Sequence, residues 1–195
     1  MAKVDIFNTR NKYKVILADP PWDYTNKGSA SDHRGMAAYH YNVMKEAEIS
    51  ALPVADLCED KAILFMWATF PNIEKALKVI KAWGFEYKTA GFVWVKENKK
   101  SPGLYMGMGA YTRANAEVCL VAIKKGTQAK DYIKSHSVRQ VIISPVQEHS
   151  RKPEETRSRI VQLCGGGYTV SNSLRGSTRK AGIAGVMKYE HQIRV

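Results

Sequence analysis

The sequence of 195 residues has few cysteines and no long apolar run. Cys58, Cys119 and Cys164 are widely separated and form no C-x-x-C pair, so neither a disulfide framework nor a structural zinc site is predicted. The five histidines also lack the spacing of metal ligands, and no metal is expected. No stretch approaches the roughly 18 apolar residues of a membrane span, and the N-terminus has no apolar signal-peptide segment. These absences predict a cytoplasmic protein that is not inserted in a membrane.

Acidic side chains are also scarce, since 18 Asp and Glu stand against 30 Lys and Arg and give a formal net charge of +12. Four of these twelve excess positive charges belong to residues 170–195, which hold five basic side chains and one acidic. A basic excess favours a polyanionic partner such as nucleic acid, because neutralising phosphates releases counterions. With 45% hydrophobic residues, the chain is long enough for one domain with its own core.

The stretch VILADPPW at residues 15–22 is the most informative part of the chain. Its apolar start predicts a strand buried on both faces of a sheet, and the Pro20-Pro21 pair ends that strand at Asp19. Ligands of open α/β sheets bind at the carboxyl ends of strands. There, Asp19 and the Pro20 carbonyl can accept the hydrogens of an exocyclic amine, and Trp22 can stack on a flipped base. The alternative is that Asp-Pro-Pro is an ordinary turn and Trp22 a rim aromatic.

The rest of the chain predicts further strands that end at the same edge. Residues 62–69 and 87–96 read as strands that carry Trp67 and Trp94, and a helix that begins near Pro71 connects them. Strands are also expected at 118–123 and 141–144, with a helix that begins at Pro153. This strand–helix–strand order is what a parallel sheet with right-handed crossovers requires. We therefore expect an α/β fold.

Two long loops are predicted around this edge. Residues 23–44 show no clean period, which is uncommon in a compact domain unless the loop is functional, and we expect a mobile lid with Tyr41 at its far end. Residues 97–114 are basic at first and then rich in glycine and tyrosine, as suits a groove for single-stranded or flipped-base nucleic acid.

Together these motifs resemble the DPPW-motif N6-adenine methyltransferases, the family of eukaryotic messenger-RNA adenosine methylases and of phage and bacterial DNA adenine methylases. The resemblance covers residues 13–164 and rests on an ordered series rather than on one motif. The further matching blocks are YHY at 39–41, LFMWAT at 64–69, FVWVK at 92–96, TRANAE at 112–117 and SRKPEE at 150–155.

The resemblance implies a Rossmann-like, S-adenosylmethionine-dependent methyltransferase sheet with helices on both faces, in the permuted order that places DPPW first. It implies a flipped adenine held between Trp22, Tyr41 and Trp94, and methyl transfer to its N6 amine without a metal. It assigns Asp19 and Lys152 to the cofactor, with Lys152 meeting its carboxylate. The catalytic residues are then Asp19, Pro20, Pro21 and Trp22, and the substrate-side residues are Tyr41, Trp67, Trp94, Arg113, Asn115 and Glu117.

DNA is the favoured substrate, because a compact chain without accessory domains resembles the phage and bacterial members. RNA is the nearer alternative, and a non-catalytic nucleic-acid-binding or partner subunit of the same fold is the other. We expect a bacterial cell or a phage-infected host as the setting. Homodimers and heterodimers both remain open.

The C-terminal end departs from the family, which normally continues with a strand reading I-E-L-F-A-R and ends near W-D-x-W-G-N-E. Synonymous codons can be chosen for residues 169–190 so that, from the third base of the Thr169 codon, they read RIELFARQHTESWDSWGNEV and then a stop. We therefore hypothesise a frameshift, natural or from sequencing, between about Cys164 and Thr169. The expected organisation is a methyltransferase domain over residues 1–169 and a disordered or loosely packed tail over 170–195.

Overall fold

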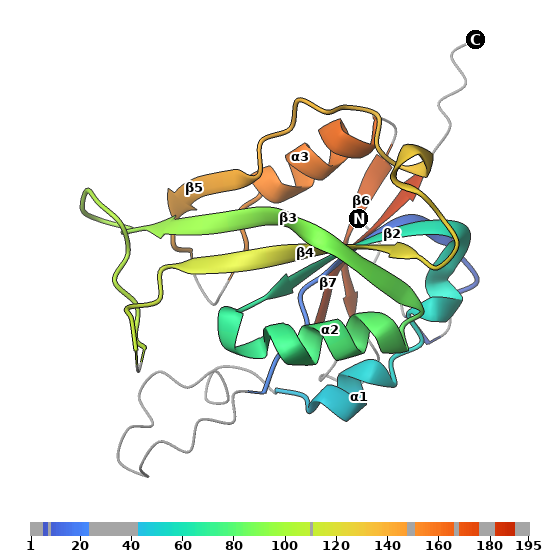
Figure 1. The fold of residues 1–195 in the computed structure, drawn as a ribbon, viewed down its shortest axis with the longest axis horizontal. Helices are drawn as coiled ribbons and strands as arrows, with labels where there is room; N and C mark the ends of the chain where they lie inside the picture. Colours follow the sequence, from blue (N-terminus) through green and yellow to red (C-terminus); the bar gives the residue numbers. More distant parts are fainter. Residues whose placement is uncertain are drawn as a thin grey trace.

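A mixed sheet of seven strands forms the centre of the computed structural model (Figure 1). The structure describes residues 6–7, 9–23, 43–109, 111–147, 151–165, 168–175 and 182–189. The strands lie in the order β5-β3-β4-β2-β1-β7-β6. Their bounds are β1 Tyr13–Ala18, β2 Cys58–Ala68, β3 Phe85–Glu97, β4 Ala116–Lys124, β5 Val141–Pro145, β6 Tyr168–Arg175 and β7 Gly182–Tyr189. The described helices are α1 Glu46–Ser50, α2 Ile73–Ala82, α3 Glu155–Cys164 and the short 3-10 helices η2 Ala55–Leu57, η3 Phe70–Asn72 and η4 Ala129–Asp131.

Helices cover both faces of the sheet, as predicted. Side chains alternate across a strand, so Ile16 and Ala18 of β1 face one cluster of buried residues and Val15 and Leu17 face the other. The first cluster includes buried residues of α1 and α2, and the second includes Ile160 and other residues of α3. In Figure 1, α1 and α2 accordingly lie on one side of the strands and α3 on the other. This arrangement confirms the predicted α/β fold class.

Strand direction corrects the expectation of a parallel sheet. β1 and β2 are parallel, and so are β3 and β5. However, β4 lies between β2 and β3 and runs antiparallel to both. β2 and β3 therefore point the same way, as the intervening helix α2 requires, but they are not neighbours. The hydrophobic pattern of β4 shows that it is buried and does not report its direction, which is why sequence reasoning missed this insertion.

Part of the segment predicted to be a disordered or loosely packed tail forms strands, and the division into residues 1–169 and 170–195 stays a prediction. β6 and β7 form an antiparallel hairpin, and β7 pairs antiparallel with β1 through Val15↔Met187, Ile16↔Val186 and Leu17↔Gly185. A buried strand such as β1 would otherwise present a row of unpaired backbone groups on that side. Hydrogen bonding to β1 therefore gives this segment its place in the sheet despite its polar and glycine-rich sequence.

The helix α2 ends near the glycine that the sequence predicts. Gly84 has a φ of 80° directly after α2, where a side chain would be strained, so glycine ends this helix as predicted. None of the described helices has the length and apolar character needed to cross a membrane. Among the same residues, no group of three or more His, Cys, Asp and Glu side chains comes together as a metal site.

Candidate active site

Asp19 directly follows β1, and this places its carboxylate at the end of a strand that is buried on both faces. Because β1 and β2 are parallel, with Leu17 opposite Phe65 and Ala18 opposite Met66, both strands end at the same edge. The side chain of Asp19 remains 25% exposed there. The predicted position of Asp19 at the carboxyl edge of the sheet is therefore confirmed.

The DPPW turn is held by hydrogen bonds on both sides. The amide of Trp22 donates to the Pro20 carbonyl at 2.9 Å, and the amide of Met44 donates to the Pro21 carbonyl at 2.8 Å. A carbonyl oxygen has two lone pairs. The Pro20 carbonyl can therefore accept the Trp22 amide and, as predicted from the sequence, also accept a hydrogen from a substrate amine. Pro20 and Pro21 restrict the backbone of this turn, because the proline ring fixes φ.

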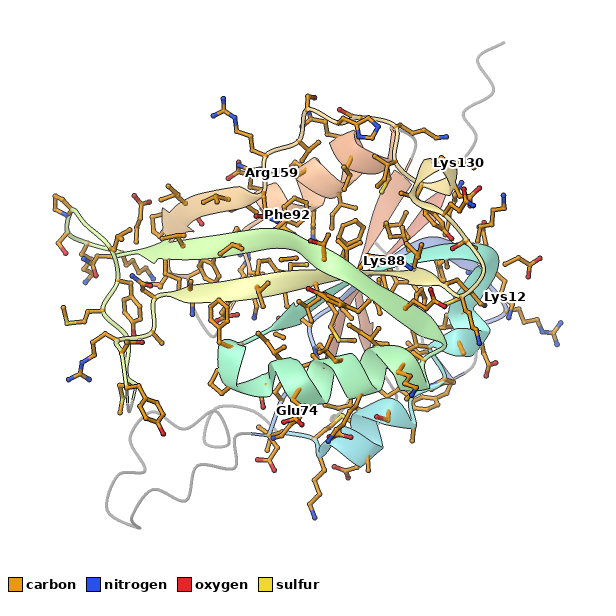
Figure 2. All side chains as sticks on the ribbon, in the orientation of Figure 1. Lys12, Glu74, Lys88, Phe92, Lys130 and Arg159 are labelled. Atoms are coloured by element: carbon orange, nitrogen blue, oxygen red, sulfur yellow. The ribbon has the colours of Figure 1, made fainter. Side chains whose placement is uncertain are left out.

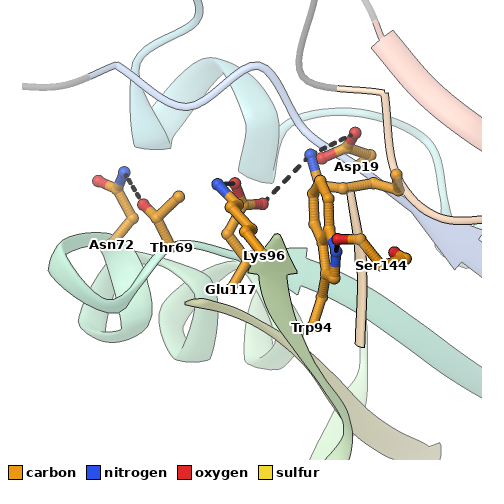
Figure 3. Close-up of polar contacts among 8 residues, drawn as sticks. Asp19, Thr69, Asn72, Trp94, Lys96, Glu117 and Ser144 are labelled. Carbon is orange, nitrogen blue, oxygen red and sulfur yellow. Dashed lines mark hydrogen bonds and ion pairs between the residues drawn. The ribbon is translucent and has the colours of Figure 1, made fainter. Parts of the chain in front are cut away.

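Asp19 is one of four charged side chains, from separate parts of the chain, that form a continuous row (Figure 3). The Lys152 Nζ lies 3.0 Å from Asp19 Oδ2 and 3.4 Å from Glu117 Oε2. On the far side of Glu117, the Lys96 Nζ donates to Oε1 at 2.6 Å. Lys152 is 13%, Glu117 9% and Lys96 19% exposed. The positive and negative charges alternate and balance, as buried charges require.

The surroundings shift the pKa of each group in this row. Burial raises the pKa of Asp19, the Lys152 ammonium opposes this rise, and the Glu117 charge adds to it. Burial alone would raise the pKa of Glu117, but the ammonium groups of Lys152 and Lys96 together lower it. Burial alone would lower the pKa of Lys152, but Asp19 and Glu117 raise it. Lys152 is therefore a firmly protonated ammonium and Glu117 a firmly ionised carboxylate, whereas Asp19 binds a proton more readily than usual.

The three predicted tryptophans lie together but are packed inside the protein. Trp22, Trp67 and Trp94 are 5%, 1% and 2% exposed. The Trp22 indole donates to the Trp67 carbonyl and the Trp94 indole to the Ser144 carbonyl, each at 3.0 Å. Trp67 and Trp94 pack edge to face with ring centres 6.5 Å apart. Trp22 and Trp94 are thus buried in this structure, and base stacking by these two side chains stays a prediction.

The remaining substrate-side predictions lie in the segment between β3 and β4. Arg113 is exposed, and Asn115 is half-buried with its carbonyl accepting the Lys96 amide at 2.8 Å. Residues 104–107 fold back beside this chain, because the Tyr105 amide donates to the Lys96 carbonyl and the Gly107 amide to the Ala114 carbonyl. Direct contact of Arg113 or Asn115 with a base stays a prediction. Tyr41 and most of the predicted lid over 23–44 lie outside the described residues.

The same segment carries exposed aromatic and basic side chains, which stand out from the end of β3 and β4 (Figure 2). Tyr105 is 38% and Tyr111 101% exposed, and Lys99 and Lys100 are exposed near them. Gly107 is required for the fold-back, because a Cβ atom there would lie 2.1 Å from the Ala114 carbonyl oxygen. The sequence-based prediction of a nucleic-acid surface on residues 97–114 thus has accessible side chains to support it.

Sequence reasoning missed Lys96 as a site residue. It lies in the FVWVK block two residues after Trp94, and the Trp94↔Glu117 register then brings it diagonally opposite Glu117 on the same face. Its Nζ also lies 5.0 Å from the centre of the Trp94 ring. The alternation of β3 already showed that Trp94 and Lys96 share a face. Only the register with β4 could identify their charged partner.

Comparison with known proteins identifies the family that this site represents. The MT-A70 family matches residues 13–174. The chain belongs to the MT-A70 family. The match includes the DPPW turn and every member of the charged row, and it extends ten residues beyond the predicted limit at residue 164. The predicted family resemblance is confirmed.

Relatives within the MT-A70 family occur in bacteria and eukaryotes. The chain is 35% identical to the type II methyltransferase M.MunI of Mycoplasma sp over 158 residues. This aligned region covers 74% of this chain and 64% of M.MunI. It is 28% identical over 156 residues to the human N(6)-adenosine-methyltransferase catalytic subunit METTL3, covering 80% of this chain and 24% of that subunit. A putative N(6)-adenosine-methyltransferase of Medicago truncatula is 30% identical over 91% of this chain and 27% of its own length. The chain therefore spans less than two thirds of each of these relatives.

S-adenosylmethionine is the expected cofactor of MT-A70 methyltransferases, and the described residues fit its chemistry. The molecule carries a carboxylate and an ammonium group, and the edge of the sheet offers the Lys152 ammonium and the partly exposed Asp19 carboxylate. The indole nitrogen of Trp67, which lies beside Lys152, is buried and has no hydrogen-bond partner among the described residues. Such a donor favours a site in which a further polar group is bound.

Proposed function

We propose that this protein transfers a methyl group from S-adenosylmethionine to the N6 amine of adenine in nucleic acid, with DNA as the preferred substrate. The observation that carries the proposal is the Asp19 carboxylate, which is fixed at the carboxyl edge of the sheet and remains partly exposed beside Lys152. Membership of a methyltransferase family supplies the reaction class. The higher identity to a bacterial type II methyltransferase than to METTL3 favours the bacterial side of that family.

The chemistry expected of these residues is orientation of a weak nucleophile. Asp19 and the Pro20 carbonyl accept the two hydrogens of the adenine amine, which draws its lone pair away from the ring and toward the methyl group. When bound, the cofactor would supply that methyl group from a positively charged sulfur, which leaves as a neutral thioether with the electron pair of the broken carbon–sulfur bond. As the nitrogen–methyl bond forms, the amine loses one proton, and the raised pKa of Asp19 makes this carboxylate a suitable acceptor. Lys152 holds the cofactor's carboxylate in this proposal.

The test is methylation of matched DNA and RNA oligonucleotides, with N6-methyladenine measured by mass spectrometry. We expect methylated DNA with the wild type and about a 10³-fold lower rate with Asp19→Asn, because the amide cannot accept the proton. A matched control is Asp131→Asn, which removes an aspartate paired with Lys61 at 2.8 Å far along the chain from Asp19. Activity confined to RNA would contradict the DNA preference, and an Asp19→Asn variant as active as the wild type would contradict the mechanism.

A non-catalytic nucleic-acid-binding subunit is the second candidate, favoured by the departure of residues 170–195 from the family ending. Calorimetric titration with S-adenosylmethionine separates the two. Saturable one-to-one binding supports the enzyme. A folded protein that binds oligonucleotides but gives no heat with the cofactor supports the subunit.

A further inference from the structure

Glu117 is a buried carboxylate near the start of β4. Its side chain is 9% exposed, and the β4 residues that follow it, Val118, Cys119 and Leu120, all belong to the buried core. Removing a carboxylate from water is unfavourable unless it is paired, and an apolar side chain of similar volume often stabilises a core at least as well. The presence of Glu117 is therefore best explained by the two ammonium groups that its oxygens bind, those of Lys96 and Lys152.

One of these oxygens is fixed by the sheet itself. Lys96 of β3 lies diagonally opposite Glu117 and donates to Oε1 at 2.6 Å. The same ammonium lies over the Trp94 ring, and the Trp94 indole is anchored to the Ser144 carbonyl of β5. Three neighbouring strands thus contribute to holding the carboxylate in one orientation.

The other oxygen faces a residue that no strand holds. Lys152 lies in the segment between β5 and α3, and its ammonium bridges Glu117 at 3.4 Å and Asp19 at 3.0 Å (Figure 3). Glu117 supplies the end of this bridge that is fixed within the sheet. Asp19 lies just beyond the end of β1, so its carboxylate depends on side-chain partners for its orientation.

We propose that Glu117 is a positioning residue that acts through Lys152 on Asp19, with Lys96 holding Glu117 in place. This inference rests on the proposed function of Asp19 and replaces the general substrate-side role predicted for Glu117 from the sequence with a specific one. Glu117 touches neither the adenine nor the cofactor. Glu117 affects the reaction by fixing the orientation of the Asp19 carboxylate.

Replacement of Glu117 by glutamine preserves the shape of the side chain and removes its charge. Lys152 then keeps Asp19 as its only ionised partner in the row, and the orientation of Asp19 loosens. We expect kcat to fall about 100-fold, the loss typical of a small misplacement of a reacting group. The KM for the oligonucleotide should stay within about twofold, because no substrate contact is removed.

The substitution also predicts a change in the titration of Asp19. The charged groups that face Asp19 are Lys152 from the segment before α3 and Glu117 from β4, and Cys119 of β4 lies close enough to sense its charge. The negative charge of Glu117 raises the pKa of Asp19, so its removal lowers that pKa. The acid limb of the kcat/KM profile should move to lower pH in Glu117→Gln. A role of Glu117 that depends only on the shape of its side chain would not move it, because glutamine keeps that shape.

The experiment compares the wild type and Glu117→Gln by kcat, KM and pH profile, and by carbon NMR titration of the Asp19 carboxyl assigned with Asp19→Asn. The matched control is Glu86→Gln, which removes an exposed glutamate of β3 paired with Lys88 at 3.0 Å. We expect a lower kcat and a lower Asp19 pKa in Glu117→Gln alone. An unchanged kcat together with an unchanged Asp19 titration overturns the inference.

Two further results keep the inference separate from folding and from the proposed function. If Glu117→Gln does not fold, the double variant Glu117→Gln/Lys96→Met leaves no unpaired charge between β3 and β4. A folded double variant with wild-type kcat and Asp19 titration overturns the inference. If the wild type methylates no adenine but the Asp19 titration still shifts in Glu117→Gln, the proposed function fails and the coupling of Glu117 to Asp19 stands. If the wild type is active and Glu117→Gln changes neither kcat nor the Asp19 titration, the inference alone fails.

Discussion

β1 pairs with a different kind of strand on each side. One neighbour belongs to the body of the protein, residues 13–164, and the other belongs to the C-terminal hairpin of β6 and β7. On one side, β1 pairs in parallel with β2, and both strands are apolar and buried through residues 15–18 and 62–68. On the other, it pairs with β7, which contains Gly182 and Gly185, while β6 contains the run Ser-Asn-Ser. Glycine, serine and asparagine are poor strand formers. The hairpin therefore owes its place to the hydrogen-bonding demand of β1 rather than to its own propensity.

The largest expected effect of a single change is in the body. Phe65 is fully buried in β2 and stacks with Phe92, with ring centres 6.0 Å apart. Phe65→Ala should lower the free energy of unfolding by about 3–5 kcal/mol, because it leaves a cavity at the centre of the sheet. Urea unfolding followed by circular dichroism measures this loss. A loss below about 1 kcal/mol would show that the body is no more tightly specified than the hairpin.

Replacing the hairpin sequence tests the comparison from the other side. Substituting RIELFARQHTESWDSWGNEV for residues 169–190 places Ile, Leu and Phe in the segment that forms β6, and we expect about 2 kcal/mol of added stability, roughly the burial of one such side chain. We also expect tighter binding of S-adenosylmethionine by calorimetry. The control is a tail of the same composition in scrambled order. Equal stability and affinity of the two tails would contradict the frameshift hypothesis, as would a gene sequence that confirms the present frame on both strands.

The body was predictable because its pattern is local. The run VILA followed by Asp-Pro-Pro defined both β1 and the position of Asp19, since periodicity and proline act on adjacent residues. Lys152 was identified from the family resemblance, and the structure placed it against Asp19. What depended on distant pairing was missed: the antiparallel direction of β4, the Lys96–Glu117 pair, and the burial of the Trp22 indole against the Trp67 carbonyl. Register and strand order are set by tertiary packing, and a single sequence does not display them.

A backbone change in the hairpin should have a smaller effect than one in the body. Val186 lies opposite Ile16 of β1 and Ser171 of β6, so proline there removes one amide donor from the ladder. We expect Val186→Pro to lower stability by about 1 kcal/mol, the net worth of one hydrogen bond. Val186→Thr keeps the donor and is the matched control. Failure of Val186→Pro to fold would mean that the hairpin is as essential as β2.

The smallest expected effect of Val186→Pro is on how the free energy of unfolding changes with pH. Asp19, Glu117, Lys152 and Cys164 of the body have shifted pKa values. Val186→Pro changes no titrating side chain, so it should lower the free energy of unfolding by the same amount at every pH. Urea unfolding between pH 3 and 10 gives this comparison directly.

The direction of the pH dependence follows from each group in the charged row. The lowered pKa of Glu117 contributes stability that is present above its ordinary value of 4.5 and is lost as the pH falls through its folded pKa. The raised pKa of Lys152 contributes stability that is present below 10.5 and is lost as the pH rises through its folded pKa. The raised pKa of Asp19 acts in the opposite sense to Glu117, because protonation of Asp19 favours the folded state.

Glu117→Gln removes the Glu117 contribution, so the variant should lose stability less steeply in acid than the wild type. Val186→Pro should follow the wild-type slope across the same range. A hairpin variant with a changed slope would show that a titrating group of residues 168–189 is coupled to the charged row, and the division between body and hairpin would then fail. Parallel curves for Val186→Pro, combined with a flatter acid limb for Glu117→Gln, would instead locate the electrostatic part of stability in the same residues that hold Asp19.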